Sequence, residues 1–178
     1  MNKNRAIFFL LLIFILPGFS QRSEPRLKKR SGDIGIGAGI DYGGFGIQAN
    51  QFIGPICLTG GYGYNKVYFL PFGGVKYYIP LDKYDIIFAP YIKVIYGYNA
   101  VIIIKNGPKD FYSGFTPGVG TDIRFGKKKS FGFNFDINVP IRTKKYIRDK
   151  DFYKLIYPSY KPNILPVSLS LGFQVCLD

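Results

Sequence analysis

The stretch that decides the fold is residues 114–141, GFTPGVGTDIRFGKKKSFGFNFDINVPI. Its two halves alternate large apolar residues with small or polar ones, and a basic turn at 127–129 separates them. Because successive side chains of a strand point to opposite faces, the alternation predicts two strands joined as a hairpin. One face of the second strand carries Phe131, Phe133, Phe135, Ile137, Val139 and Ile141. Such a hairpin fits either a soluble sandwich or a membrane barrel whose apolar face meets lipid.

The same alternation recurs along the chain and predicts eight strands, whereas no segment longer than a few residues shows the 3.6-residue period of a helix. In the first strand Ile40 and Tyr42 continue the apolar face, and Ala100–Ile104 extends the fifth strand. Three connections are short (near 54–55, 82–85 and 126–130) and three are longer (near 65–72, 99–113 and 142–164). Short turns at one end and long loops at the other are the layout of an outer-membrane barrel.

The N-terminus has the pattern of an export signal. Lys3 and Arg5 precede an apolar run, Ala6–Leu16, and Pro17, Gly18 and Ser20 form a cleavage region. The run is shorter than the roughly eighteen apolar residues that a membrane-spanning helix needs. We therefore expect a cleaved signal peptide at 1–20, a basic tail at 21–32 and one barrel domain at 33–178.

The charges of the predicted strands all fall on the face that is rich in glycine and polar residues. A Lys or Arg facing lipid at the midplane costs about 2–4 kcal/mol, whereas a charge inside a narrow barrel can pair with an opposite one. We therefore predict an ion-pair cluster that plugs the lumen, formed by Asp41, Lys76, Lys93, Asp122, Arg124 and Asp136.

Two motifs support a family resemblance: Gly-x-Gly-x-Asp-x-Arg-Phe at 118–125 and Leu-Ser-Leu-Gly-Phe at 169–173. With the export signal and the eight strands, they resemble the small outer-membrane β-barrel domain proteins of Gram-negative bacteria, Bacteroidota above all. The resemblance covers about residues 33–178. It implies an all-β, closed, antiparallel up-and-down transmembrane barrel in the bacterial outer membrane, and it names no activity.

The residue types argue against catalysis. The chain contains no histidine, so a triad of the usual kind is excluded, and its two cysteines do not make a zinc site. Asp122 and Asp136 could act as an acid–base pair, but we expect nearby cations to neutralise them. We predict no enzyme, no cofactor and no metal, and no disulfide between Cys57 and Cys176, which lie on opposite sides of the barrel. The alternative is a secreted, lipocalin-like carrier of a small apolar ligand.

The segment 142–164 carries seven basic residues against two aspartates, with tyrosines among them. Lys and Arg bind phosphate, and tyrosine suits the membrane–water boundary. We expect a monomer whose outward loop contacts lipopolysaccharide phosphates or an envelope protein, in preference to nucleic acid. The expected contact residues are Arg142, Lys144, Lys145, Arg148, Lys150, Tyr153 and Tyr157.

Overall fold

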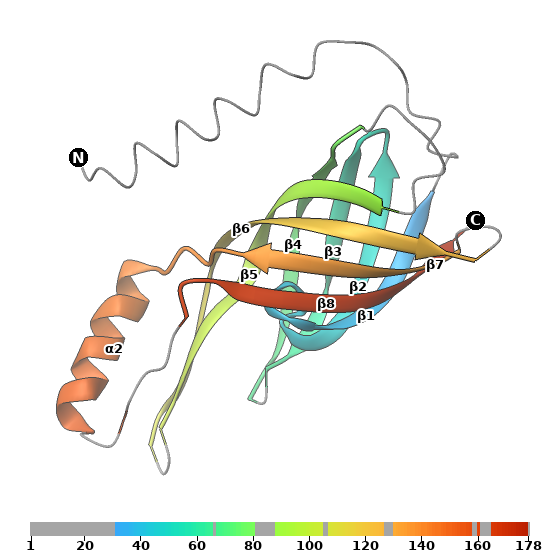
Figure 1. The fold of residues 1–178 in the computed structure, drawn as a ribbon. Helices are drawn as coiled ribbons and strands as arrows, with labels where there is room; N and C mark the ends of the chain where they lie inside the picture. The colour runs from blue at the N-terminus through green and yellow to red at the C-terminus, as the bar shows by residue number, and fades with distance from the viewer. Residues whose placement is uncertain are drawn as a thin grey trace, which may run out of the picture.

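The chain folds into a closed barrel with a two-part projection at one end (Figure 1). The computed structural model describes residues 31–65, 67–80, 88–104, 107–126, 130–157, 160 and 165–177. The predicted signal peptide and most of the predicted basic tail lie outside these residues. Each strand pairs antiparallel with the next along the chain, and β1 pairs with β8 to close the ring. The predicted fold class, an eight-stranded up-and-down barrel, is confirmed.

The strand bounds place both ends of the barrel chain at one mouth, because Gly32 pairs with Leu177. The opposite mouth is formed by the β1–β2, β3–β4, β5–β6 and β7–β8 connections. The strands are β1 (Gly32–Gly39), β2 (Gly44–Ile53), β3 (Ile56–Tyr64), β4 (Phe69–Tyr78), β5 (Phe88–Ile103), β6 (Lys109–Phe125), β7 (Phe131–Asn138) and β8 (Ser168–Leu177).

The two faces of the wall differ sharply in chemistry. Exposed apolar side chains cover the outside, and buried polar ones fill the inside. Phe125, Phe131, Phe133 and Phe173 form one group of ring contacts on the outer surface, with Phe131 and Phe173 stacked at 6.1 Å. The outward side chains include Ile34, Ile36, Ile47, Leu58, Val75, Ile92, Val94, Phe115, Val119, Phe135, Leu169 and Leu171. An apolar exterior around a polar interior is the pattern of a barrel immersed in lipid.

The first strand is shorter than its alternation predicts. It ends at Gly39, and Ile40–Tyr42 form a single 3₁₀ turn, η2, which folds into the barrel against β1, β2, β3, β5 and β8. Gly39 (φ 123°) and Gly43 (φ 61°) flank the turn in conformations that L side chains rarely adopt. The expectation that Ile40 and Tyr42 face outward is therefore wrong, because both are buried in the lumen.

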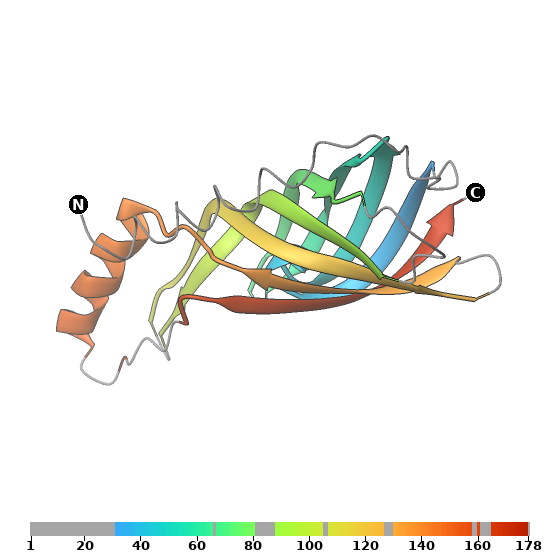
Figure 2. The same cartoon turned by 45° about the horizontal axis from the view of Figure 1, so that its top comes forward.

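Two longer connections also differ from the sequence-based expectation. The 65–72 loop shrinks because β4 starts at Phe69, and the 99–113 loop is mostly strand, since β5 runs to Ile103 and β6 starts at Lys109. The expected extension of the fifth strand through Ala100 is confirmed. The 142–164 connection contains a helix, α2 (Lys144–Ile156), which lies beside the extended β5–β6 hairpin beyond the barrel (Figure 2). None of the helices in the described residues is long and apolar enough to cross a bilayer.

Two prolines sit inside long strands where the neighbouring ladder stops. The carbonyl of Pro90 in β5 accepts from the Ile79 amide (2.9 Å), one residue past the β4–β5 ladder. The carbonyl of Pro117 in β6 accepts from the Val139 amide (2.9 Å), next to the β6–β7 ladder. Each missing N–H therefore falls at the edge of a ladder, where proline is tolerated.

The turn η2 makes two wall glycines sensitive to substitution. A Cβ on Gly37 or Gly172 would lie closer than 3.0 Å to the Tyr42 ring or hydroxyl. We expect Gly172→Ala to lower the free energy of unfolding by about 1–3 kcal/mol through overpacking. The atom nearest to a Cβ on Gly172 is the Tyr42 hydroxyl, followed by Asn134 Oδ1 and the Tyr42 Cζ, so the losses caused by Gly172→Ala and Tyr42→Phe should be less than additive in the double variant. Urea unfolding in lipid vesicles measures both, and additive losses in the double variant would contradict the contact.

Candidate functional site: the lumen network and the arm

Lys93 of β5 holds the half of the lumen nearest η2. Its ammonium forms ion pairs with Asp41 of η2 and with Asp136 of β7, the latter at 2.6 Å. The amide of Asn138 donates to the same Asp41 carboxylate at 2.8 Å. These contacts join η2 to two strands on the other side of the barrel, so the turn is fixed inside the mouth.

Tyrosines complete this half of the network. Tyr91 donates to Asp136 at 2.7 Å, and Tyr42 reaches across the lumen to donate to Asn134 at 2.7 Å. Asn134 in turn donates to Asp136 at 2.8 Å. Each of these side chains is almost completely buried, so the hydrogen bonds supply the polar contacts that burial removes.

Arg124 of β6 holds the half of the lumen nearest the chain ends. Its Nη2 contacts Asp33 of β1 at 2.7 Å and Asp122 of its own strand at 2.8 Å, and donates to Gln174 of β8 at 2.8 Å. Tyr78 donates to Asp122 at 2.8 Å. Asp33 was absent from the predicted cluster, although its position on the polar face of the first strand was visible in the sequence.

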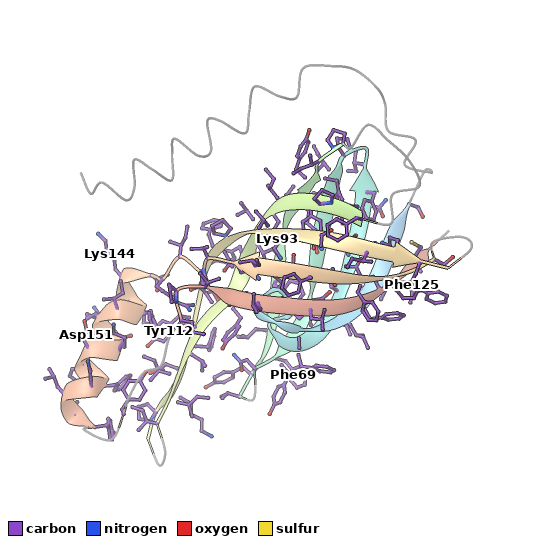
Figure 3. The ribbon with its side chains drawn as sticks, in the orientation of Figure 1. Phe69, Lys93, Tyr112, Phe125, Lys144 and Asp151 are labelled. Atoms are coloured by element: carbon purple, nitrogen blue, oxygen red, sulfur yellow. The ribbon has the colours of Figure 1, made fainter. Side chains whose placement is uncertain are left out.

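All six predicted lumen residues lie inside the barrel, where the direct ion pairs fall into two groups, one around Lys93 and one around Arg124. Lys76 stands between the two halves: its ammonium donates to Gln48 at 3.3 Å and lies 5.1 Å from the centre of the Tyr91 ring. Asp122 and Asp136 belong to different halves, each beside a cation. Figure 3 places Lys93 within the barrel and Phe125 on its outside.

The interior chemistry separates the alternatives. A carrier of an apolar ligand needs an apolar cavity, whereas this interior holds ion pairs, amides and tyrosine hydroxyls. Among the described residues, no group of three or more Cys, Asp or Glu is arranged to hold a metal ion. Cys57 and Cys176 do not form a disulfide with each other, and Arg124 Nη1 lies 3.6 Å from the Cys176 sulfur.

Lys93 provides a direct test of the network. Lys93→Met leaves two buried carboxylates without their cation, and we expect the free energy of unfolding to fall by about 3–5 kcal/mol. The exposed Lys109→Met is the matched control and should change it little. Adding Asp41→Asn and Asp136→Asn to Lys93→Met should recover part of the loss, because no unpaired charge then remains. A Lys93→Met variant as stable as the wild type would refute the role of these pairs.

The second feature is the projection, which we call the arm: residues 99–113 of the β5–β6 hairpin together with α2. It begins at a bulge where Asn99 falls between Tyr98 and Ala100. Asn99 donates to Thr116 at 3.1 Å and accepts from Arg142 at 3.0 Å, so the bulge anchors the chain just before α2. Thr143 then caps the helix by accepting from the Tyr146 amide at 3.3 Å.

Tyrosines and two aspartates attach α2 to the hairpin. The rings of Tyr112 and Tyr146 meet edge to face at 5.1 Å. Tyr112 donates to Asp149 at 3.1 Å, and Tyr153 donates to Asp110 at 2.7 Å. A small apolar core lies between the two parts, formed by Ala100, Ile102, Ile104, Tyr112 and Tyr146, with Tyr153, Tyr157 and Tyr160 beside it.

The seven predicted contact residues of 142–164 are divided by this docking. Tyr153 and Tyr157 pack against the hairpin, and Arg142 is half-buried at Asn99 and 5.8 Å from the Tyr146 ring. Lys144, Lys145 and Arg148 are exposed, and Lys150 pairs with Asp151 at 3.5 Å. The expected aromatic loop is therefore wrong: the tyrosines form the inner face of a helix. Their spacing at 146, 153 and 157 was the available signal.

The Tyr153–Asp110 contact gives the arm a defined pH response. The hydrogen bond to the Asp110 carboxylate, aided by partial burial, raises the pKa of Tyr153 to about 12. A raised pKa means that the contact stabilises docking fully below the ordinary tyrosine pKa of about 10 and is lost as pH rises toward 12. Amide exchange of α2 in the wild type and in Tyr153→Phe should therefore differ at neutral pH. Equal protection there would contradict the contact.

Together these observations define the class: a membrane-spanning β-barrel with a polar, ion-paired interior and a docked helical arm. Among solved structures, the N-terminal β-barrel domain of Pseudomonas aeruginosa OprF matches with a TM-score of 0.50 and 11% sequence identity, covering 83% of this chain and 98% of that domain. Neisserial surface protein A (NspA) aligns with a TM-score of 0.39 and 13% identity, over 82% and 94% of the two chains.

At these identities the likeness to OprF concerns the fold alone. No family model matches the sequence, and no curated protein matches it. The chain therefore shares the barrel architecture of that domain, while its arm and lumen have to be interpreted from their own residues.

Proposed function

We propose that the chain is a non-enzymatic protein of the bacterial outer membrane, exported by its N-terminal signal, with a blocked lumen and an outward working surface on the arm. The observation that carries the proposal is the combination of an apolar barrel exterior with an arm at the mouth opposite both barrel ends (Figure 1). The OprF domain supports the architecture. The barrel anchors the protein in the membrane. The protein itself has a structural or adhesive role, or acts as a partner of other envelope components.

The blocked lumen follows from its contents. An eight-stranded barrel is only wide enough for side chains or one small ligand. Here η2 fills the mouth nearest the arm, and the ion pairs of Lys93 and Arg124 lie behind it. We expect the purified protein in planar bilayers to show no sustained open-pore current. A stable wild-type current of the size of a general diffusion pore would refute the blocked lumen.

The anchor can be tested in cells. The protein should fractionate with outer membranes and should migrate differently in detergent gels before and after heating, as a folded barrel does. Recovery in the soluble extracellular fraction without detergent would instead favour a secreted protein, against the membrane reading.

The lipid contact rests on the start of α2. Lys144, Lys145 and Arg148 are exposed, and Lys144 lies at the end of the helix nearest the barrel (Figure 3). In a monomer inserted in the membrane, these three side chains would lie level with the phosphates of the outer leaflet, such as those of lipopolysaccharide. Lys and Arg are both suited to bind phosphate.

Substitution of Lys144, Lys145, Arg148 and Lys150 by serine tests this contact. We expect the variant barrel to fold but to bind anionic lipid vesicles several-fold more weakly than the wild type, most clearly at low salt. Lys109→Ser, at the far end of the hairpin, is the control and should bind as the wild type does. Equal binding by the four-serine variant at low salt would leave these charges as solubilising groups only.

A further inference from the structure

One side of α2 carries apolar residues that remain half or more exposed in the described chain. Phe152, Leu155 and Ile156 have exposed fractions of 56%, 83% and 51%. Their spacing of three and four residues places them side by side on the helix surface. We call Phe152, Leu155 and Ile156 the outer stripe.

The outer stripe lies on the part of the molecule that is furthest from lipid. The hairpin and α2 extend away from the barrel in both views (Figures 1 and 2), and Asp151 lies further from the barrel than Lys144 (Figure 3). Phe152, Leu155 and Ile156 follow Asp151 toward the distal end. A bilayer that surrounds the barrel therefore does not cover them, and a cluster of exposed apolar side chains in water marks an interaction surface.

The charges around the outer stripe are mostly positive. Lys144, Lys145, Arg148 and Lys154 are exposed, whereas Asp149 is half-buried, pairs with Arg148 at 3.2 Å and accepts a hydrogen bond from Tyr112. Asp151 is the only exposed carboxylate of α2, and it lies 3.5 Å from the ammonium of Lys150. A partner that matches this surface has apolar side chains at its centre and carboxylates at its rim.

A second copy of the chain does not fit this surface. Two copies in one membrane are related by an axis normal to the bilayer, so their α2 helices pack in parallel with equal residues at equal heights. Arg148 would then face the partner's Arg148, and like charges brought together oppose association. Polysaccharides and nucleic acids offer no apolar side chains for Leu155.

We propose that the outer stripe binds an acidic amphipathic helix of another protein. Such a helix would lay apolar residues at i, i+3, i+4 and i+7 against Phe152, Leu155 and Ile156. A flanking Asp or Glu side chain would meet Arg148, which lies one turn before Phe152 on the same side of the helix. This surface shares Arg148 with the lipid contact proposed for the start of α2, but its central residues are apolar and distal.

The test uses the full chain in nanodiscs of zwitterionic lipid, so that anionic lipid does not compete. The probe is a fluorescent peptide of about 18 residues, long enough to form a helix, built from Leu, Glu, Gln and Ala with leucines at i, i+3, i+4 and i+7. Its controls are an isomer with the leucines scattered and a peptide with Lys in place of Glu. We expect binding of the first peptide, and at least about tenfold weaker binding of both controls.

Leu155→Glu should weaken binding of the acidic peptide by at least about tenfold, through both lost apolar contact and added repulsion. Because Leu155 is so exposed, the substitution leaves α2 docked, which amide exchange of the helix checks. The triple variant Phe152→Ser, Leu155→Ser, Ile156→Ser should lose binding as well. Phe69→Ser, an exposed residue at the start of β4, is the matched control and should bind as the wild type does.

Three results would overturn the proposal. The first is equal binding of the aligned and scattered peptides, which would indicate charge attraction alone. The second is a wild-type dimer that Leu155→Glu dissociates in sedimentation, which would make a second copy the occupant. The third is loss of anionic-vesicle binding in the triple variant, which would assign the outer stripe to the membrane. Failure of the four-serine variant to change vesicle binding would refute the lipid contact and leave the helix-binding result intact.

Discussion

The constraint on which the structure depends is that a closed sheet in lipid has to keep its charged side chains on its inside. Closure of β8 on β1 pairs the strand edges, so the backbone polar groups are satisfied within the wall. The side chains then separate by face, with apolar residues toward lipid and charges toward the lumen. In a barrel of eight strands the lumen is narrow, and its charges have to pair with one another. Lys93 between two aspartates and Arg124 between two others are the result.

The same narrow lumen explains the abundance of glycine in the strands. Tyr42 and Tyr91 are large, yet both lie fully inside the barrel. Gly37 and Gly172 leave room for the Tyr42 ring, and Gly120 leaves room for that of Tyr91. Bulky residues thus require small residues on the wall where their rings lie, which keeps the packing dense without an open channel.

The fold could be predicted from the strand periodicity because apolar and polar side chains have to alternate along the whole of each lipid-facing strand. The lumen cluster followed from the same rule, since a charge on the polar face can only point inward. The prediction placed Tyr42 on the outer face because it extended the strand alternation past Gly39. The positive φ of Gly39 instead ends the strand and turns the chain into the barrel. The alternation also places Asp33 on the polar face of the first strand. Its ion pair with Arg124, however, depends on β1 and β6 meeting across the lumen. That contact is set by the three-dimensional closure and has no signature in local sequence.

The helix of the arm was missed for a different physical reason. Beyond the lipid, the β5–β6 hairpin is a two-stranded ribbon, which is marginally stable in water without a covering element. Here α2 provides the cover: the ring of Tyr146 packs in one core with Ala100 and Ile102, and the hydroxyl of Tyr153 donates to Asp110. In return, Tyr112 of the hairpin donates to Asp149 of α2. Because the buried face of α2 consists of tyrosines, a search for aliphatic residues at helical spacing does not find this helix. Because tyrosines already serve the hairpin, the aliphatic residues of α2 are not needed for docking. The 83% exposure of Leu155 therefore has no role in docking α2, and the partner helix proposed above would cover it.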